Sequence, residues 1–133
     1  VESYPPRIEA ATRNFVRSPY RDHITLVPGD AGALLHRLVE EEQHFDFIFM
    51  DAAKAQYIVW LPDILRLMSP GSVLVSDNIL QDGSIIESRY QVERRDRTIH
   101  TRMREYLFRL KHEAALETAI LPVGDGVSIS VRK

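Results

Sequence analysis

Apolar residues along the chain switch between helical and strand-like spacing. Four stretches repeat apolar positions every three or four residues, which predicts helices at 6–17, 34–39, 57–68 and 99–110. Shorter apolar runs between them predict strands at 23–27, 45–50, 73–75, 119–122 and 127–131, with the strand at 45–50 mostly buried. Because strands alternate with helices, we predict an α/β fold with a largely parallel sheet.

Proline and glycine mark the breaks between these elements. Pro62 inside the third helix predicts a kink or a restart, and Ser69-Pro70-Gly71 predicts a turn. Only residues 123–126, with a turn at Gly124-Asp125-Gly126, separate the last two strands, so they are predicted to form an antiparallel hairpin. The pattern contains no internal repeat and no domain boundary, which predicts a single domain over residues 1–133.

Composition narrows the class of protein. The chain has 133 residues, of which 44% are hydrophobic, and this is typical of a globular domain. No apolar run reaches the length that spans a bilayer, so no membrane partner is expected. The chain contains no cysteine, which excludes disulfides and thiolate metal sites and agrees with a cytoplasmic location.

The charge is unevenly distributed along the chain. The net charge is −2, yet the segment 89–111 carries eight basic and three acidic residues and is therefore +5. One interpretation is a phosphate-binding surface for RNA. The other is a solvated helix with ion pairs Glu93–Arg97 and Glu105–Arg109.

Acidic and amide side chains follow two successive predicted strands. Asp51 ends one strand, and Asp77 and Asn78 end the next. If these strands are neighbours, the three side chains meet at the carboxyl edge of the sheet, where α/β proteins bind ligands. Their oxygens suit Mg²⁺, Mn²⁺ or Ca²⁺ rather than zinc. The alternative is that Asp51 caps the next helix and that Asp77 and Asn78 form an Asx turn.

Three motifs resemble one enzyme family across essentially the whole chain. They are F-D-F-I-F-M-D-A-A-K-A-Q-Y at 45–57, S-P-G-S-V-L-V-S-D-N at 69–78 and L-P-V-G-D-G-V-S-I-S at 121–130. They resemble the cation-dependent class I O-methyltransferases, which include catechol and caffeoyl-CoA O-methyltransferases. The chain looks most similar to the bacterial tRNA 5-hydroxyuridine methyltransferases of that family. The resemblance implies a Rossmann-like class I methyltransferase sheet and a homodimer.

The resemblance also implies roles for particular residues. Asp51, Asp77 and Asn78 match the family's metal ligands, and Lys54 matches a lysine that assists deprotonation of the substrate hydroxyl. A divalent cation lowers the pKa of a hydroxyl group that it binds. Lys54 follows Asp51 by three residues, so one helical turn would bring both to the same face.

A second set of residues matches the S-adenosylmethionine side of the family's site. Glu2 resembles the acidic residue that binds the ribose hydroxyls, and Asp30 with Ala31 resembles the adenine-side contact. Asp51 is also expected among the cofactor-binding residues. Without the resemblance, Glu2 is an ordinary terminal charge and Asp30 a helix cap.

The glycine-rich loop of such folds does not occur in this sequence. In the family, the first strand lies between the strand ending at Glu2 and the strand ending at Asp51. We therefore expect the domain to be incomplete at its N-terminus. A structure that paired the strand of Glu2 directly with that of Asp51 in a closed sheet would refute this expectation.

The acceptor remains open between two chemistries. A catechol offers two neighbouring oxygens, and 5-hydroxyuridine in tRNA offers O4 beside its 5-hydroxyl, so the expected partner is tRNA or a small phenol. A third possibility is a non-catalytic fragment or an oligomerisation module. The five histidines show no metal-type spacing and receive no role, and Tyr57 is interpreted as a core residue.

Overall fold

The computed structural model describes residues 1–80, 83, 85, 88 and 90–133. These form two compact units, Val1–Glu41 and Glu42–Lys133. Among the described residues, every helix is too short or too polar to cross a bilayer.

The first unit consists of two helices and one short bridge. Helix α1 spans Pro5–Val16, a 3-10 turn η1 spans Arg21–His23, and helix α2 spans Ala31–Glu40. The prediction of a strand at 23–27 is wrong. Residue 23 belongs to η1, and the pairing near this segment is limited to a parallel bridge between Glu2 and Pro28.

The second unit is a four-stranded sheet in the order β1-β2-β4-β3. Its strands are β1 (Phe45–Met50), β2 (Met68–Ser76), β3 (Leu116–Leu121) and β4 (Val127–Arg132). β1 pairs with β2 in parallel, and β4 runs antiparallel to both β2 and β3. The α/β fold and the terminal hairpin are confirmed, in a mixed sheet whose β4 alone runs opposite to the other three strands.

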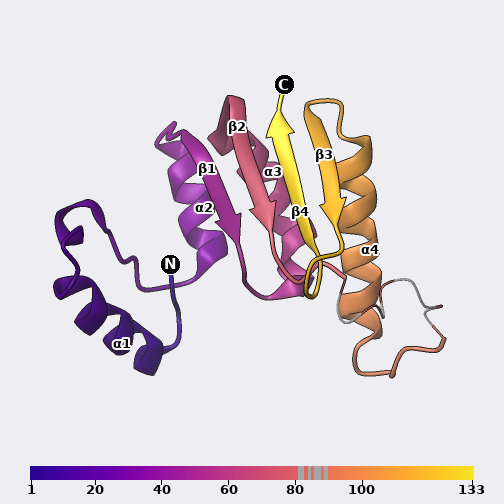
Figure 1. Cartoon of the computed structure of the whole chain (residues 1–133), viewed down its shortest axis with the longest axis horizontal. Coiled ribbons are helices and arrows are strands. Elements are labelled where there is room, and N and C mark those ends of the chain that lie inside the picture. Colours follow the sequence, from indigo (N-terminus) through magenta and orange to yellow (C-terminus); the bar gives the residue numbers. More distant parts are fainter. Residues whose placement is uncertain (81–82, 84, 86–87, 89) are drawn as a thin grey trace. The chain divides into compact units, whose positions relative to one another are not determined.

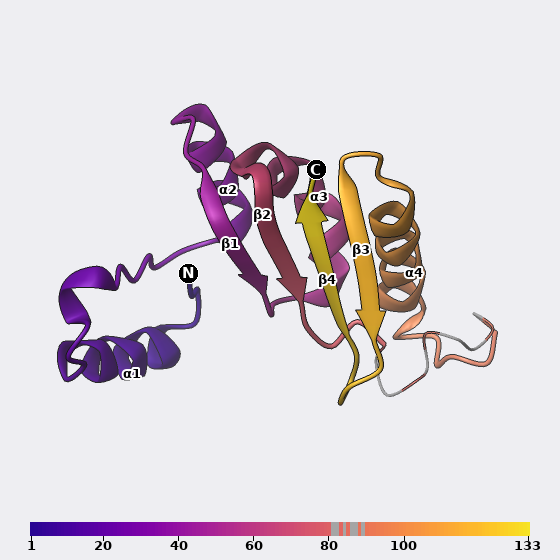
Figure 2. The same cartoon turned by 45° about the horizontal axis from the view of Figure 1, so that its top comes forward.

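Two helices cover one face of this sheet (Figures 1 and 2). A 3-10 turn η2 (Lys54–Gln56) leads into α3 (Tyr57–Leu67), which contains Pro62, and α4 spans Arg97–His112. Apolar side chains of both helices are at most 2% exposed: Leu61, Ile64, Leu67, Met103 and Leu110. On the sheet below them, Ser76 Oγ lies 2.6 Å from the hydroxyl of Tyr106 on α4. Burial raises the pKa of that Tyr106 hydroxyl, which therefore stays neutral.

Two details of the sheet differ from the prediction. The expected turn at residues 69–71 lies inside β2, where Phe45 pairs with Met68 but Phe47 already pairs with Val73. The extra residues form a bulge, held by Ser69 N donating to Ser72 Oγ at 3.0 Å. The prediction that 45–50 is mostly buried is also wrong. Phe47 and Phe49 are 59% and 57% exposed, because they lie on the sheet face opposite α3 and α4.

Candidate functional site

The site begins where β1 and β2 end side by side. Met50 pairs with Ser76, and Asp77 N donates to Met50 O at 3.0 Å. Asp51 and Asp77 therefore follow two adjoining strand ends, as the sequence predicted. Parallel strands bring such residues to the same edge of the sheet.

Oxygen atoms from four residues surround the ammonium group of Lys54. Its Nζ lies 3.0 Å from Asp51 Oδ1, 2.8 Å from the Tyr57 hydroxyl, 3.1 Å from Asp77 O and 3.2 Å from Asn78 Oδ1. The side chains of Asp51 and Asn78 thus contact one positively charged group. The arrangement places one ammonium group among oxygen atoms, and oxygen is the donor type that hard cations prefer.

The protonation of Lys54 reflects opposing effects. Partial burial acts to lower the pKa of Lys54, but hydrogen bonds to Tyr57 and Asp51 favour the charged form, and the pKa lies above its ordinary value. The side chain of Lys54 is 18% exposed and that of Asp51 is 53% exposed. The ammonium therefore balances the charge of an oxygen cluster that is exposed to solvent on the Asp51 side.

The structure tests the helix-cap alternative for Asp51 and shows a local hydrogen bond at Asp77. The short helix after Asp51 has Ala53 as its N-cap, so the interpretation of Asp51 as a helix cap is wrong. Asp77 Oδ1 accepts a hydrogen bond of 2.8 Å from Asn78 N, and Asn78 adopts φ 53°. The described residues include no cluster of three or more His, Cys, Asp or Glu side chains suited to a metal. The predicted set contains two carboxylates and one amide.

Sequence reasoning missed the role of Tyr57. Its side chain is fully buried, as expected of a core residue. Its hydroxyl also accepts hydrogen bonds from Lys54 Nζ and from Ala52 N at 3.1 Å, and donates to Met50 O at 2.9 Å. Tyr57 follows Lys54 by three residues, and this helical spacing was the available signal.

The predicted cofactor residues Glu2, Asp30 and Ala31 lie together in the first unit. Glu2 Oε1 accepts hydrogen bonds of 2.9 Å from the backbone amides of Tyr4 and Ser3. The bond from Tyr4 is the largest cause of a lowered pKa for the Glu2 carboxyl. Asp30 Oδ1 caps α2 by accepting from Ala33 N at 2.9 Å, and Ala31 is the first residue of that helix.

The basic segment makes mostly structural contacts. Arg89 lies outside the described residues. Four basic side chains donate to backbone carbonyls: Arg97 to Val92, Arg102 to Ala55, Arg104 to Ile85 and Lys111 to Thr118. The predicted ion pairs are replaced by others, since Glu93 pairs with Arg95 and Arg109 with Glu113.

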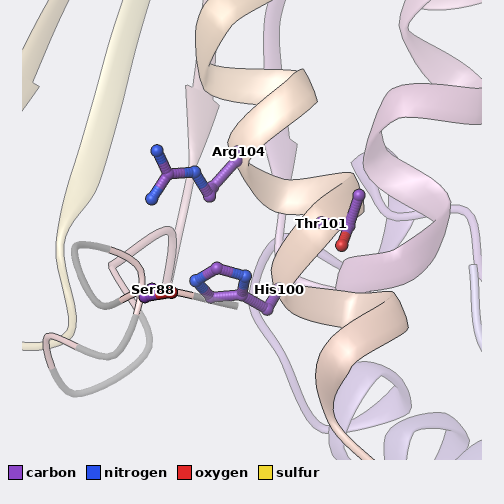
Figure 3. A pocket seen from close by; sticks show the side chains of 4 residues that line it. All are labelled: Ser88, His100, Thr101 and Arg104. Atoms are coloured by element: carbon purple, nitrogen blue, oxygen red, sulfur yellow. The ribbon is translucent and has the colours of Figure 1, made fainter. Parts of the chain in front are cut away.

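A hollow lies beside the N-terminal half of α4 (Figure 3). It is lined by Ser88, His100, Thr101 and Arg104. His100 is 2% exposed and lies among the buried residues of α4, with Met103, Tyr106 and Leu110. Among the described residues, neither ring nitrogen of His100 has a hydrogen-bond partner.

Replacing His100 with leucine is expected to raise the free energy of unfolding by about 1 kcal/mol, because a buried polar group without partners is unfavourable. Urea denaturation of the two proteins measures this. His44→Leu, at an exposed position, is the control and should change stability by less than about 0.5 kcal/mol. A loss of more than about 1 kcal/mol in His100→Leu would show that the ring makes a stabilising contact.

Comparison with known proteins agrees with this architecture. A family model described as O-methyltransferase matches residues 1–133. A caffeoyl-CoA O-methyltransferase from Citrus natsudaidai is 33% identical over 108 residues, which cover 78% of this chain and 47% of that protein. A catechol O-methyltransferase from Niastella koreensis is 34% identical over 88 residues, which cover 65% of this chain and 40% of that protein. The chain spans about half the length of the curated relatives that it matches.

A solved structure has the same fold. The O-methyltransferase from Bacillus cereus in complex with SAH superposes with a TM-score of 0.84 at 25% identity, over 98% of this chain and 60% of that one. Since the family model covers every residue and the fold agrees, this chain belongs to the O-methyltransferase family.

Proposed function

We propose that the protein transfers a methyl group from S-adenosylmethionine to a hydroxyl of a small aromatic diol, assisted by a divalent cation. The observation that carries the proposal is the convergence of Asp51 Oδ1 and Asn78 Oδ1 on one cationic group. Carboxylate and amide oxygens at the carboxyl ends of neighbouring strands are suited to this task.

The residues proposed to hold the cation are Asp51, Asp77 and Asn78. Their donor set fits a hard cation, because Asp51 Oδ1 and Asn78 Oδ1 already contact an ammonium group. Asp77 contacts that group through its backbone carbonyl, and its carboxylate accepts a hydrogen bond from Asn78 N. When bound, Mg²⁺ or Mn²⁺ supplies Lewis-acid chemistry that lowers the pKa of a hydroxyl in contact with it.

Lys54 is the proposed catalytic residue. Its Nζ lies among the proposed ligands, held by Tyr57 and Asp51, where it can donate a hydrogen bond to the acceptor oxygen. The hydroxyl loses its proton to solvent, and the ammonium stabilises the oxyanion. That oxygen forms a bond to the methyl carbon as the carbon–sulfur bond breaks and leaves its electron pair on sulfur. The products are the methyl ether and the neutral thioether of the cofactor.

Glu2, Asp30 and Ala31, all in the first unit, are proposed to bind S-adenosylmethionine. The relative from Bacillus cereus was solved in complex with SAH, and the chain matches it over 98% of its residues. In the first unit, Glu2 pairs with Pro28, and Pro28 precedes Asp30 by two residues. The backbone bridge therefore brings Glu2 close to the segment that leads into Asp30.

A small phenol is favoured over tRNA as acceptor by two observations. The similar proteins are named for catechol and caffeoyl-CoA. Four of the basic side chains near α4 donate to backbone carbonyls, which reduces the number that face a phosphate backbone.

The test is methyl transfer by the purified protein with labelled S-adenosylmethionine and Mg²⁺, offered either catechol or tRNA that lacks wobble modification. We expect label in catechol and loss of the activity after treatment with a chelator. Label only in tRNA would replace the proposed acceptor. Cofactor binding without transfer to either acceptor would favour a non-catalytic module.

A further inference from the structure

We infer that Asp125 is a positioning residue that fixes which end of the Asn78 amide faces the cation site. The inference rests on the proposed function. Asp125 lies in the turn between β3 and β4, and its Oδ2 accepts a hydrogen bond of 3.0 Å from Asn78 Nδ2. Asn78 Oδ1 thereby faces the ammonium of Lys54, at 3.2 Å from Nζ.

The chemistry of an amide makes this contact selective. The oxygen and nitrogen ends of an asparagine side chain have nearly the same shape, so neighbouring groups decide its orientation. The carboxylate of Asp125 only accepts hydrogen bonds and therefore binds the NH₂ end. A cation binds only the oxygen end. The Asp125 carboxylate and the cation thus select the same orientation of the Asn78 amide. Without Asp125, only the cation selects it.

Backbone hydrogen bonds hold the turn between β3 and β4 against residues 79 and 80, which follow Asn78, independently of the Asp125 side chain. Ile79 N donates to Gly126 O at 3.0 Å, and Leu80 N donates to Asp125 O at 2.8 Å. Gly126 has φ 84°, and a Cβ at this position would overlap the side chain of Leu80. The close approach therefore depends on glycine. A substitution of the Asp125 side chain leaves both backbone bonds in place.

The test is the affinity for Mn²⁺ alone, measured by electron paramagnetic resonance without acceptor. Four proteins form a double-mutant cycle: wild type, Asp125→Ala, Asn78→Gly and the double variant. Glycine accepts the φ of 53° at position 78, so Asn78→Gly removes the amide without backbone strain. We expect Asp125→Ala to weaken binding about tenfold, as loss of a group that orients a ligand does. In the Asn78→Gly background its effect should fall below about twofold, because the residue acts through Asn78.

Asp125→Asn separates orientation from charge. Asparagine keeps an acceptor oxygen for Asn78 but removes the negative charge, so its affinity should lie between those of wild type and Asp125→Ala. Glu117→Gln, which removes a carboxylate that is 82% exposed on β3, should bind Mn²⁺ as wild type does. If Asp125→Ala fails to fold, Asp125→Asn replaces it in the double-mutant cycle with Asn78→Gly, because asparagine has the same shape as aspartate.

Three results would overturn the inference. Additive losses in the cycle would mean that Asp125 acts independently of Asn78. Equal losses in Asp125→Asn and Asp125→Ala would mean that charge alone matters. If wild type and Asn78→Gly bind Mn²⁺ equally, or neither binds it, the proposed metal site fails first and this inference fails with it.

Discussion

Replacing Asp51 with asparagine is expected to slow methyl transfer roughly 100- to 1,000-fold, which corresponds to about 3–4 kcal/mol of transition-state stabilisation. Asp51 contributes the carboxylate oxygen that lies 3.0 Å from the Lys54 ammonium. Asparagine keeps the size of the side chain but removes the charge that attracts a divalent cation. Initial rates with labelled S-adenosylmethionine and catechol, at saturating Mg²⁺, measure the effect.

A matched control separates this effect from a general loss of charge. Asp46→Asn removes an exposed carboxylate near the start of the same strand, β1, and should leave the rate within about twofold of wild type, as distant surface changes usually do. An Asp51→Asn protein as active as wild type would contradict the assignment of Asp51.

Replacing Lys54 with methionine is expected to lower the rate without lowering the affinity for metal. The rate should fall about 100-fold, since the acceptor oxyanion loses its positively charged hydrogen-bond donor. Affinity for Mn²⁺ should stay the same or increase, because the ammonium occupies the oxygens that a metal would use. Initial rates and Mn²⁺ titration on the same preparation measure the two quantities.

The outcome also distinguishes catalysis from folding. Lys133→Met is the control, since the side chain of Lys133 is 54% exposed and its ammonium lies 3.7 Å from Glu117 Oε2. If Lys54→Met loses rate and metal affinity together with a lowered melting temperature, Lys54 is structural. A Lys54→Met protein with the wild-type rate would exclude it from the reaction.

Local pattern was sufficient to predict the part of the site that lies on consecutive strands. β1 begins and ends where the apolar run 45–50 does, and parallel pairing with β2 then brings Asp51 beside Asp77. The i, i+3 spacing of Asp51 and Lys54 predicted that they share a face, and their side chains form an ion pair.

Contacts between distant segments could not be predicted in the same way. Asp125 meets Asn78 only because β4 pairs with β2, and no local spacing encodes that distance along the chain. The bulge at 69–72 was interpreted as a turn, because proline and glycine mark both structures. The segment 23–27 has strand-like composition but forms no strand, since β propensity depends on available pairing and the bridge next to it joins only Glu2 and Pro28.

The most direct test of the cation site is anomalous diffraction from a crystal of the protein soaked in Mn²⁺. The account predicts one manganese peak about 2.1–2.2 Å from side-chain oxygens of Asp51, Asp77 and Asn78, with the Lys54 ammonium moved away from its present contacts. A map without a peak at that place, with Lys54 still bound to Asp51 and Asn78, would contradict it.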